Sequence, residues 1–521
     1  MTATPYQQLE QRFKRLSALA EAEAVLHWDL AAVMPRGGAQ ARGEQLAELK
    51  AVRHAMLTAP ETGELLAAAD AVDGLDAWQR ANLREMRRRW SKATALSEDL
   101  VVALSKAESA CETVWRTARP AGDFALIRPY LEELLNRVRE AAEAKAAKQG
   151  LGLYDALLDD FEPDGRCADI DREFAELEAF LPGFLAEVLD RQAAAGAPLM
   201  PEGPFPRATQ EALGIRLMEA LGFDFDHGRL DVSLHPFCGG TPDDVRITTR
   251  YDEDDFTSSL MGVLHETGHA LYERGLPKAW RGQPVGDALG MSMHEGQSLL
   301  IEMQVCRSEK FLNYAAPLMR KMFDGRGPAW EPGNPYRVYT QVKPDFIRVD
   351  ADEVTYPAHV ILRYRLEKAM VEGRMQVADL PGAWNEGMQK LLGLTPPSDR
   401  EGCLQDLHWY DGAWGYFPTY TLGAMTAAQL FDAARCADPA IEQKMIEEID
   451  RAMQSRDSVG GSFQVVARGV PPGLGSHRHW DLRLNARLAA ALCSIQSIKA
   501  IAIGAGVESA QGCRPSVAAL G

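Results

Sequence analysis

The segment that most constrains this chain is His265-Glu266-Thr267-Gly268-His269, within an apolar run from Val263 to Tyr272. The run predicts a helix, on which positions i and i+4 share one face, so His265 and His269 can both reach one metal ion. Glu266 is offset by one residue and can act as a general base on an attacking water. Two core histidines would show the same spacing by coincidence. A third ligand on a nearby helix would favour the metal site.

Glu295 is the predicted third ligand. It lies beside His294 in a segment that is otherwise apolar and predicts a second helix. A glutamate on a helix is more often a solvated surface residue, but two histidines and one glutamate are a common ligand set of catalytic zinc, with a fourth position left for water. We therefore expect a divalent ion, zinc or alternatively cobalt, held by His265, His269 and Glu295.

At these two segments the chain resembles the carboxypeptidase Taq family of zinc-dependent metallocarboxypeptidases. Further motifs of that family occur in order, namely His235-Pro236-Phe237 (H-P-F), residues 244–248 (D-x-R-x-T), 347–352 (I-R-x-x-A-D) and 402–409 (G-x-x-Q-D-x-H-W). The resemblance runs from Trp28-Asp29 to about Arg435, with Gly296 where the family usually has Ser. It implies a large, mainly α-helical metallopeptidase with a deep cleft, peptide substrates and a homodimeric assembly.

The resemblance also implies how a substrate is held. Removing a C-terminal residue requires a group that recognises a free carboxylate, and the planar guanidinium of arginine suits this task. The matching motifs point to Arg348, with Gln405 and His408 nearby. Arg246 is a further candidate for substrate binding, although an ion pair with Asp244 is the alternative.

Two tasks remain at such a site. A tetrahedral oxyanion needs hydrogen-bond donors besides the metal, and His408 or a tyrosine such as Tyr420 are the candidates. His235 and His294 are expected to orient ligands or substrate rather than to bind the metal themselves.

Composition limits the partners of the chain. Of its 521 residues, 46% are hydrophobic and 25% charged, which is typical of a globular protein. The net charge of −18 disfavours nucleic acid and anionic membranes as partners. No apolar run is long enough to span a membrane, the first 16 residues show no signal-peptide pattern, and the eight cysteines form no C-x-x-C pair. A reduced, cytoplasmic protein is expected.

Periodicity predicts helices for most of the chain, over residues 5–58 with a break at Pro35, and over 76–118, 123–148, 166–194 and 208–222. Residues 229–251 alternate instead and predict a β-hairpin or small sheet before the metal-binding helix. An edge strand there would either align an extended peptide or serve only as scaffold. The aromatic segment 410–420 would either line a cleft or fill a core.

The C-terminal part resembles another family. Segments such as Gly469-Val470-Pro471-Pro472-Gly473 and Ser494-Ile495-Gln496-Ser497 are similar to chorismate synthase, over about residues 436–512. The other motifs of that enzyme are missing. We therefore expect a catalytic domain at 1–435 without its own last helices, followed at 436–521 by an α+β fragment that has no activity of its own.

Three functions follow from these observations. The first is a metallocarboxypeptidase that uses Glu266 as its base. The second is an endo- or oligopeptidase with the same metal centre. The third is an inactive metal-binding scaffold, a hybrid whose C-terminal segment has abolished activity.

Overall fold

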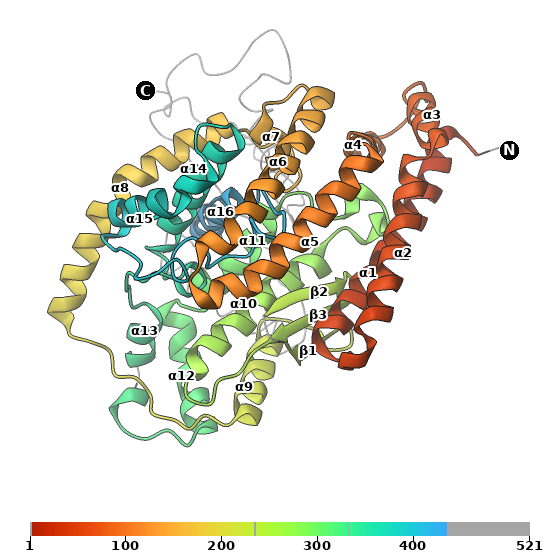
Figure 1. The fold of residues 1–521 in the computed structure, drawn as a ribbon. Coiled ribbons are helices and arrows are strands. Elements are labelled where there is room, and N and C mark those ends of the chain that lie inside the picture. Colours follow the sequence, from red (N-terminus) through yellow and green to blue (C-terminus); the bar gives the residue numbers. More distant parts are fainter. Residues whose placement is uncertain (1–2, 234–235, 332, 435–521) are drawn as a thin grey trace, which may run out of the picture. The chain divides into compact units, whose positions relative to one another are not determined.

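The computed structural model describes residues 3–434 except 234, 235 and 332. The predicted site residue His235 and the predicted fragment at 436–521 therefore lie outside the described residues. The described chain is mostly helical, and the helices predicted before residue 222 are confirmed (Figure 1). They are α1 Pro5–Ala32, α2 Ala39–Thr58, α3 Pro60–Ala69, α4 Ala77–Ala93, α5 Glu98–Ala121, α6 Phe124–Gln149, α7 Leu153–Leu158, α8 Cys167–Ala195 and α9 Arg207–Ala220.

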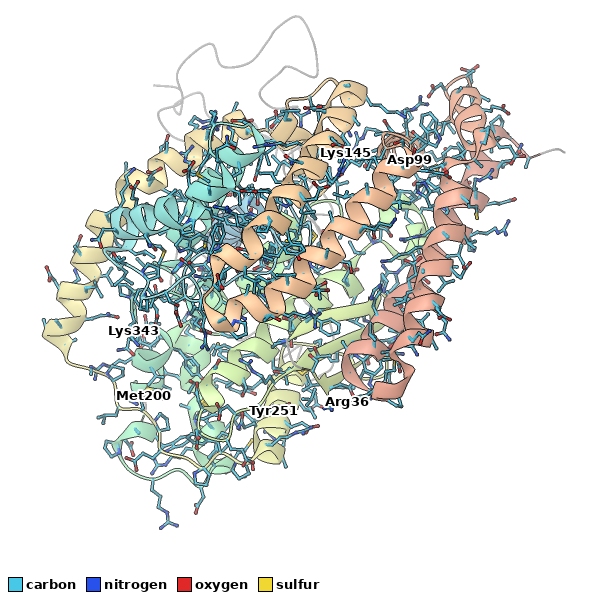
Figure 2. The ribbon with its side chains drawn as sticks, viewed as in Figure 1. Arg36, Asp99, Lys145, Met200, Tyr251 and Lys343 are labelled. Atoms are coloured by element: carbon cyan, nitrogen blue, oxygen red, sulfur yellow. The ribbon has the colours of Figure 1, made fainter. Side chains whose placement is uncertain are left out.

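Local sequence signals explain where several of these helices begin and end. The Thr4 side chain accepts a hydrogen bond from the backbone of Gln7, whose own side chain closes a capping box on α1. Helices α5 and α6 form a hairpin because Gly122 adopts a left-handed conformation between them. Asp99 near the start of α5 and Lys145 near the end of α6 consequently lie at the same end of the hairpin (Figure 2).

A three-stranded sheet interrupts the helices, with strands β1 Gly228–Val232, β2 Phe237–Thr241 and β3 Asp244–Thr249. β2 and β3 form the predicted hairpin, in which Cys238 lies opposite Ile247. β1 pairs in parallel with the other side of β3, so the order is β1-β3-β2. The buried side chains Val245 and Ile247 on β3 pack with Val263 and Ala270 of the next helix. The sheet therefore braces the predicted metal-binding helix.

The second half of the described chain is again helical. Its helices are α10 Phe256–Gly275, α11 Met291–Leu299, α12 Glu309–Met322, α13 Asn334–Tyr339, α14 Tyr356–Val371, α15 Leu380–Leu392 and α16 Pro418–Ala434. A π-helical turn, Leu300–Val305, continues α11. Short 3-10 turns lie at Arg36–Gly38, Lys278–Trp280, Pro284–Gly286, Pro328–Trp330, Arg348–Asp350 and Val377–Asp379.

The main hydrophobic core surrounds α14, which has buried residues on all of its faces. Tyr410, Trp414 and Phe417 belong to this core, so most of the aromatic segment 410–420 fills the interior. Tyr420, in contrast, extends to the polar site described below. Among the described residues, no helix has both the length and the hydropathy needed for a membrane span.

Candidate active site

α10 and α11 bring the three predicted ligands together. Nε2 of His269 lies 3.3 Å from Oε2 of Glu295, and Nε2 of His265 lies 3.7 Å from the same oxygen. Ligand atoms around a tetrahedral zinc, with bonds of ~2.1 Å, are ~3.4 Å apart. The chosen atoms all lie within 4.8 Å of one another, as a shared ion requires. The donor set and its spacing fit zinc.

The other ring nitrogen of each histidine is held from outside the ligand group. Nδ1 of His265 lies 2.9 Å from Oε2 of Glu302, whose other oxygen accepts a 2.5 Å bond from Arg307. Nδ1 of His269 lies 2.6 Å from Nδ1 of His294. With both Nδ1 atoms engaged, both Nε2 atoms face the common point beside Glu295.

Electrostatics at this point favour positive charge. Burial opposes ionisation of Glu295, but His265 and His269 outweigh it and lower its pKa to about 2. Burial likewise opposes protonation of His265, yet Glu295 and Glu302 raise its pKa to about 10. A buried carboxylate pair that stabilises a proton so strongly would also stabilise a cation in its place.

Glu266 faces the same group from α10 and is nearly buried, with 7% of its surface exposed. Burial raises its pKa to about 7, and the charges of Glu295 and Glu302 add to this effect. Burial and the charge of Glu266 also raise the pKa of Cys238 on β2. A carboxyl group with this pKa is suited to accept and return a proton near neutral pH.

Glu295 is fixed by close packing as well as by charge. Ser298 donates a 3.1 Å hydrogen bond to its carboxylate. On the other side α16 approaches closely, since a Cβ added at Gly423 would lie 2.9 Å from Cβ of Glu295. α16 therefore positions the predicted ligand Glu295 although it contributes no predicted ligand itself.

Arg348 lies in a buried cluster of charges. Its Nε and Nη2 donate to Oδ1 of Asp406 at 3.0 and 2.9 Å, and Nε of Arg363 donates to Oδ2 at 2.5 Å. These two arginines hold the pKa of Asp406 well below its usual range. Two guanidinium groups against one carboxylate leave an excess of one positive charge, which an anionic ligand would neutralise.

Gln405 uses its side chain on the backbone. Its Oε1 accepts from the backbone N–H of Arg348 at 2.9 Å, and its Nε2 donates to the carbonyls of Phe346 and Glu401 at 2.9 and 2.8 Å. The side chain therefore fixes the Arg348 segment against the loop before His408.

His408 and Tyr420 form a neutral pair beside this charge cluster. Nε2 of His408 lies 3.0 Å from the Tyr420 hydroxyl. Burial, together with the charge of Arg348, lowers the pKa of His408 to about 4, and burial raises that of Tyr420 to about 12. The guanidinium of Arg348 lies 4.5 Å from the centre of the Tyr420 ring. Both groups are consequently uncharged at neutral pH and can donate hydrogen bonds.

Tyr356 connects this charge cluster to the predicted ligand Glu295. Its ring contacts that of Tyr420 edge-on at 6.3 Å between centres, and its hydroxyl lies 3.5 Å from Oε1 of Glu295. The structure thus brings His265, His269, Glu295 and Glu266 together with Arg348 and His408.

Arg246 has other partners. Its Nη2 donates to Asp244 at 2.6 Å, and its guanidinium lies 4.4 Å from the centre of the Trp28 ring. Arg229, its neighbour across the parallel pair, lies 5.0 Å from the same ring. The alternative ion pair with Asp244 is therefore present, within a contact between α1 and the sheet.

Three residues that contact the predicted site residues were not predicted from the sequence. Glu302 contacts His265, Glu273 contacts His294, and Asp406 contacts Arg348. The spacing offered a partial signal, since Glu273 follows His269 by four positions and Glu302 follows Glu295 by seven, so each pair shares a helix face. Asp406 lies inside the G-x-x-Q-D-x-H-W motif.

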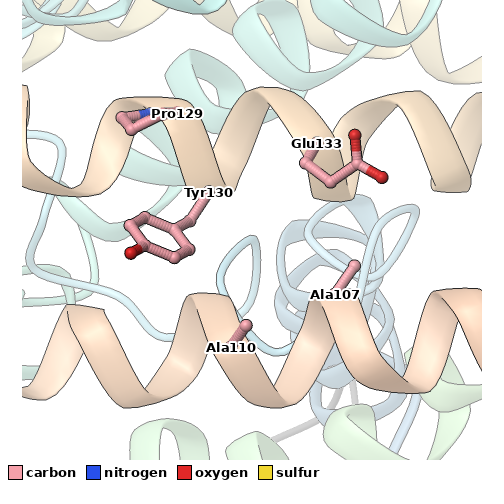
Figure 3. Close-up of a pocket in the computed structure, with 5 residues that line it drawn as sticks. All are labelled: Ala107, Ala110, Pro129, Tyr130 and Glu133. Atoms are coloured by element: carbon pink, nitrogen blue, oxygen red, sulfur yellow. The ribbon is translucent and has the colours of Figure 1, made fainter.

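A separate hollow of about 340 Å³ lies between α5 and α6. It is lined by Ala107, Ala110, Pro129, Tyr130 and Glu133 (Figure 3). None of the predicted site residues borders it.

Comparison with known proteins agrees with the geometry. A family model described as carboxypeptidase Taq (M32) metallopeptidase matches residues 8–458. Thermostable carboxypeptidase 1 of Thermus thermophilus is 39% identical over 443 residues, or 82% of this chain and 86% of that protein. The solved structure of Trypanosoma cruzi metallocarboxypeptidase 1 is similar with a TM-score of 0.82 at 43% identity, covering 87% of this chain and 90% of that one. A Pyrococcus furiosus carboxypeptidase structure has a TM-score of 0.81 at 32% identity, covering 87% and 91%.

The C-terminal part matches a different family, as the sequence predicts. The model for chorismate synthase matches residues 413–515, and this range overlaps the first match around the expected boundary near Arg435. Chorismate synthase of Acidothermus cellulolyticus is 52% identical over 80 residues, which are 15% of this chain and 20% of that protein. The chain therefore spans about one fifth of the length of that relative.

Proposed function

Because the chain belongs to the carboxypeptidase Taq (M32) family of metallopeptidases and is therefore a peptide hydrolase, we propose that it releases C-terminal residues with a zinc ion held by His265, His269 and Glu295. The observation that carries this proposal is a buried cluster with excess positive charge, at Arg348, which Tyr420 and Tyr356 connect to the converging atoms of His265, His269 and Glu295. Cobalt is the alternative ion, since it also accepts nitrogen and oxygen donors.

When bound, the ion supplies a Lewis acid that polarises the scissile carbonyl and makes water a stronger nucleophile. Glu266 takes one proton from the attacking water and returns it to the leaving amine, so the carboxyl group is unchanged after each turnover. Its burial and its raised pKa of about 7 suit both transfers.

The substrate is held by its C-terminal carboxylate at Arg348, where it neutralises the positive charge that Asp406 leaves uncompensated. Gln405 acts through the backbone of Arg348. His408 and Tyr420 donate hydrogen bonds to the oxyanion, which forms where the peptide carbonyl was. Arg246 and His235 are also assigned to substrate binding.

The decisive test uses one peptide with a free and with an amidated C-terminus, before and after chelation. Hydrolysis of the free acid alone, abolished by chelation and restored by zinc, is the expected result. Equal hydrolysis of both peptides would instead identify an endo- or oligopeptidase. Metal binding without hydrolysis of either would identify an inactive scaffold.

The remaining expectations are also part of the proposal. The similarity to chorismate synthase covers only about one fifth of that enzyme, which supports a C-terminal segment without a second activity. The family resemblance supports a homodimer, which sedimentation equilibrium tests directly. A cytoplasmic location fits the composition and can be tested by cell fractionation.

A further inference from the structure

Two histidines of the site make an unusually close contact. Nδ1 of His269 and Nδ1 of His294 are 2.6 Å apart. Such a distance requires a shared hydrogen, because two lone pairs or two N–H groups would repel each other. The opposite nitrogen of His294, Nε2, lies 2.7 Å from Oε1 of Glu273.

The direction of these two hydrogen bonds follows from the proposed ligand role of His269. Its Nε2 faces Glu295 at 3.3 Å, where the ion would bind, and a ligating nitrogen carries no hydrogen. The hydrogen of the neutral ring is then on Nδ1, which donates to Nδ1 of His294. His294 in turn carries its hydrogen on Nε2 and donates it to Glu273. A single direction thus satisfies both short contacts.

The three hydrogen-bonded residues come from two helices and are nearly enclosed. Glu273 follows His269 by one turn of α10, and His294 enters between them from α11. The His294 side chain is 14% exposed, and Tyr272 packs edge-on against its ring with centres 5.2 Å apart. These contacts restrict rotation of His294, so it can hold the ring of His269.

His265 is supported differently. Its Nδ1 reaches the carboxylate of Glu302 directly, at 2.9 Å, and Arg307 completes that arrangement. The two ligand histidines therefore have separate supports, one through an intervening imidazole and one through a carboxylate paired with an arginine.

We propose that His294 and Glu273 are positioning residues that fix the tautomer and orientation of His269, independently of the Glu302–Arg307 support of His265. This inference rests on the proposed metal centre. Supporting residues of this kind typically change metal affinity by 10–100-fold when they are replaced. His294 is thus expected to act on metal affinity, whereas a residue that only packs would act on folding alone.

The test measures the zinc dissociation constant by competition with a chelating dye, with the visible spectrum of the cobalt-loaded protein as a second readout. His294→Phe keeps a ring but removes the acceptor, so we expect affinity to fall 10–100-fold and the cobalt bands to change. His294→Gln keeps an acceptor and a donor and should recover part of the affinity. Glu273→Gln should weaken affinity less than His294→Phe does. Tyr272→Phe keeps the packing ring and serves as the matched control, without a change in affinity.

Independence is tested with Glu302→Gln. The losses of affinity in His294→Phe and Glu302→Gln should multiply in the double variant, and a clearly smaller combined loss would contradict separate supports. If wild type binds zinc and both His294 variants bind it equally well with the same cobalt spectrum, the positioning role is wrong while the proposed function stands. If wild type binds neither ion, both proposals fail. Far-ultraviolet circular dichroism of every variant identifies any loss of folding, in which case His294→Gln and Glu273→Gln decide.

Discussion

Gly268 of α10 lies directly against Gln297 of α11, since a Cβ built on Gly268 would be 2.6 Å from the Gln297 carbonyl oxygen. Real Cβ atoms essentially never approach another heavy atom so closely. Gly268 lies between the two predicted ligands His265 and His269 in sequence, and Gln297 lies two residues after Glu295. Because Gly268 has no side chain, α10 and α11 can lie this close together.

Gly268→Ala should separate α10 from α11 and weaken metal binding. Forcing backbone apart in a packed interior typically costs about 1–3 kcal/mol, so the melting temperature should fall and the zinc dissociation constant rise. Gly262→Ala is the matched control on the same helix, because a Cβ there meets nothing within 4 Å. That variant should be unchanged or more stable by up to about 1 kcal/mol. Equal behaviour of the two variants would show that the close contact does not matter.

Glu266→Gln should separate metal binding from turnover. The substitution keeps the shape of the side chain and leaves His265, His269 and Glu295 in place, but it removes the base. We expect full metal content by mass spectrometry and a kcat lower by about 100-fold or more. Near-normal turnover would rule out the assigned role.

Arg348→Ala should affect free-acid peptides most. Removing one partner of a buried charge pair costs about 2–5 kcal/mol, so kcat/KM on such peptides should fall by at least about 30-fold. Arg348→Lys keeps the charge but loses the planar fork and should fall in between. Hydrolysis of the amidated peptide provides the control. An equal fall on both peptides would indicate that Arg348 is structural.

His359 on α14 should make the fold sensitive to acid. Burial, with Arg363 nearby, lowers its pKa to about 3. The unfolded chain binds this proton near pH ~6.5, whereas folded His359 binds it only near pH 3. The contribution of His359 to the free energy of unfolding is therefore fully present above pH ~6.5 and is lost as the pH falls towards about 3. The slope is about 1.4 kcal/mol per pH unit for one histidine.

The variant His359→Leu removes this titration. The midpoint of its thermal unfolding should fall less between pH 7 and pH 5 than that of wild type. His54 on α2 is exposed, so His54→Gln is the control and should follow wild type. An acid decline in His359→Leu as steep as in wild type would show that other groups cause it.

A chain that ends after Arg435 should keep its peptidase activity. The residues assigned to the metal, the base and the carboxylate pocket all precede that position, and α16, which packs on Glu295, ends at Ala434. We expect kcat/KM on a free-acid peptide within a factor of about two of the full chain, because every residue assigned to the site is retained. Loss of folding in the shortened chain would show that the C-terminal segment is integrated into the fold.

Local patterns predicted the parts of the site that local chemistry determines. The helical period placed His265 and His269 on one face, and alternation predicted the β2–β3 hairpin. The parallel pairing of β1 with β3 was not predicted, because alternation does not reveal which strands become neighbours. For the same reason the bond between Arg363 and Asp406, which are 43 positions apart, required the structure.

Side-chain use was the least predictable feature. Gln405 was expected near the substrate, but its amide is occupied by four backbone groups of the adjoining segments. The aromatic segment after His408 was expected either to line a cleft or to fill a core. Trp414 lies in the core, whereas Tyr420 contacts His408. Sequence spacing cannot distinguish them, since both residues are aromatic and partly or fully buried.

The π-helical turn Leu300–Val305 has a consequence for the register of the chain. A π-turn holds one more residue than an α-turn, so the segment behaves as a one-residue insertion after α11. Because the π-turn absorbs this extra residue, deleting one residue within it would restore an α-helix and leave Arg307 in phase with Glu295, but it would turn Glu302, which lies inside the turn, away from its present position. The π-turn thus sets the angular position of Glu302, which contacts His265, separately from that of Glu295.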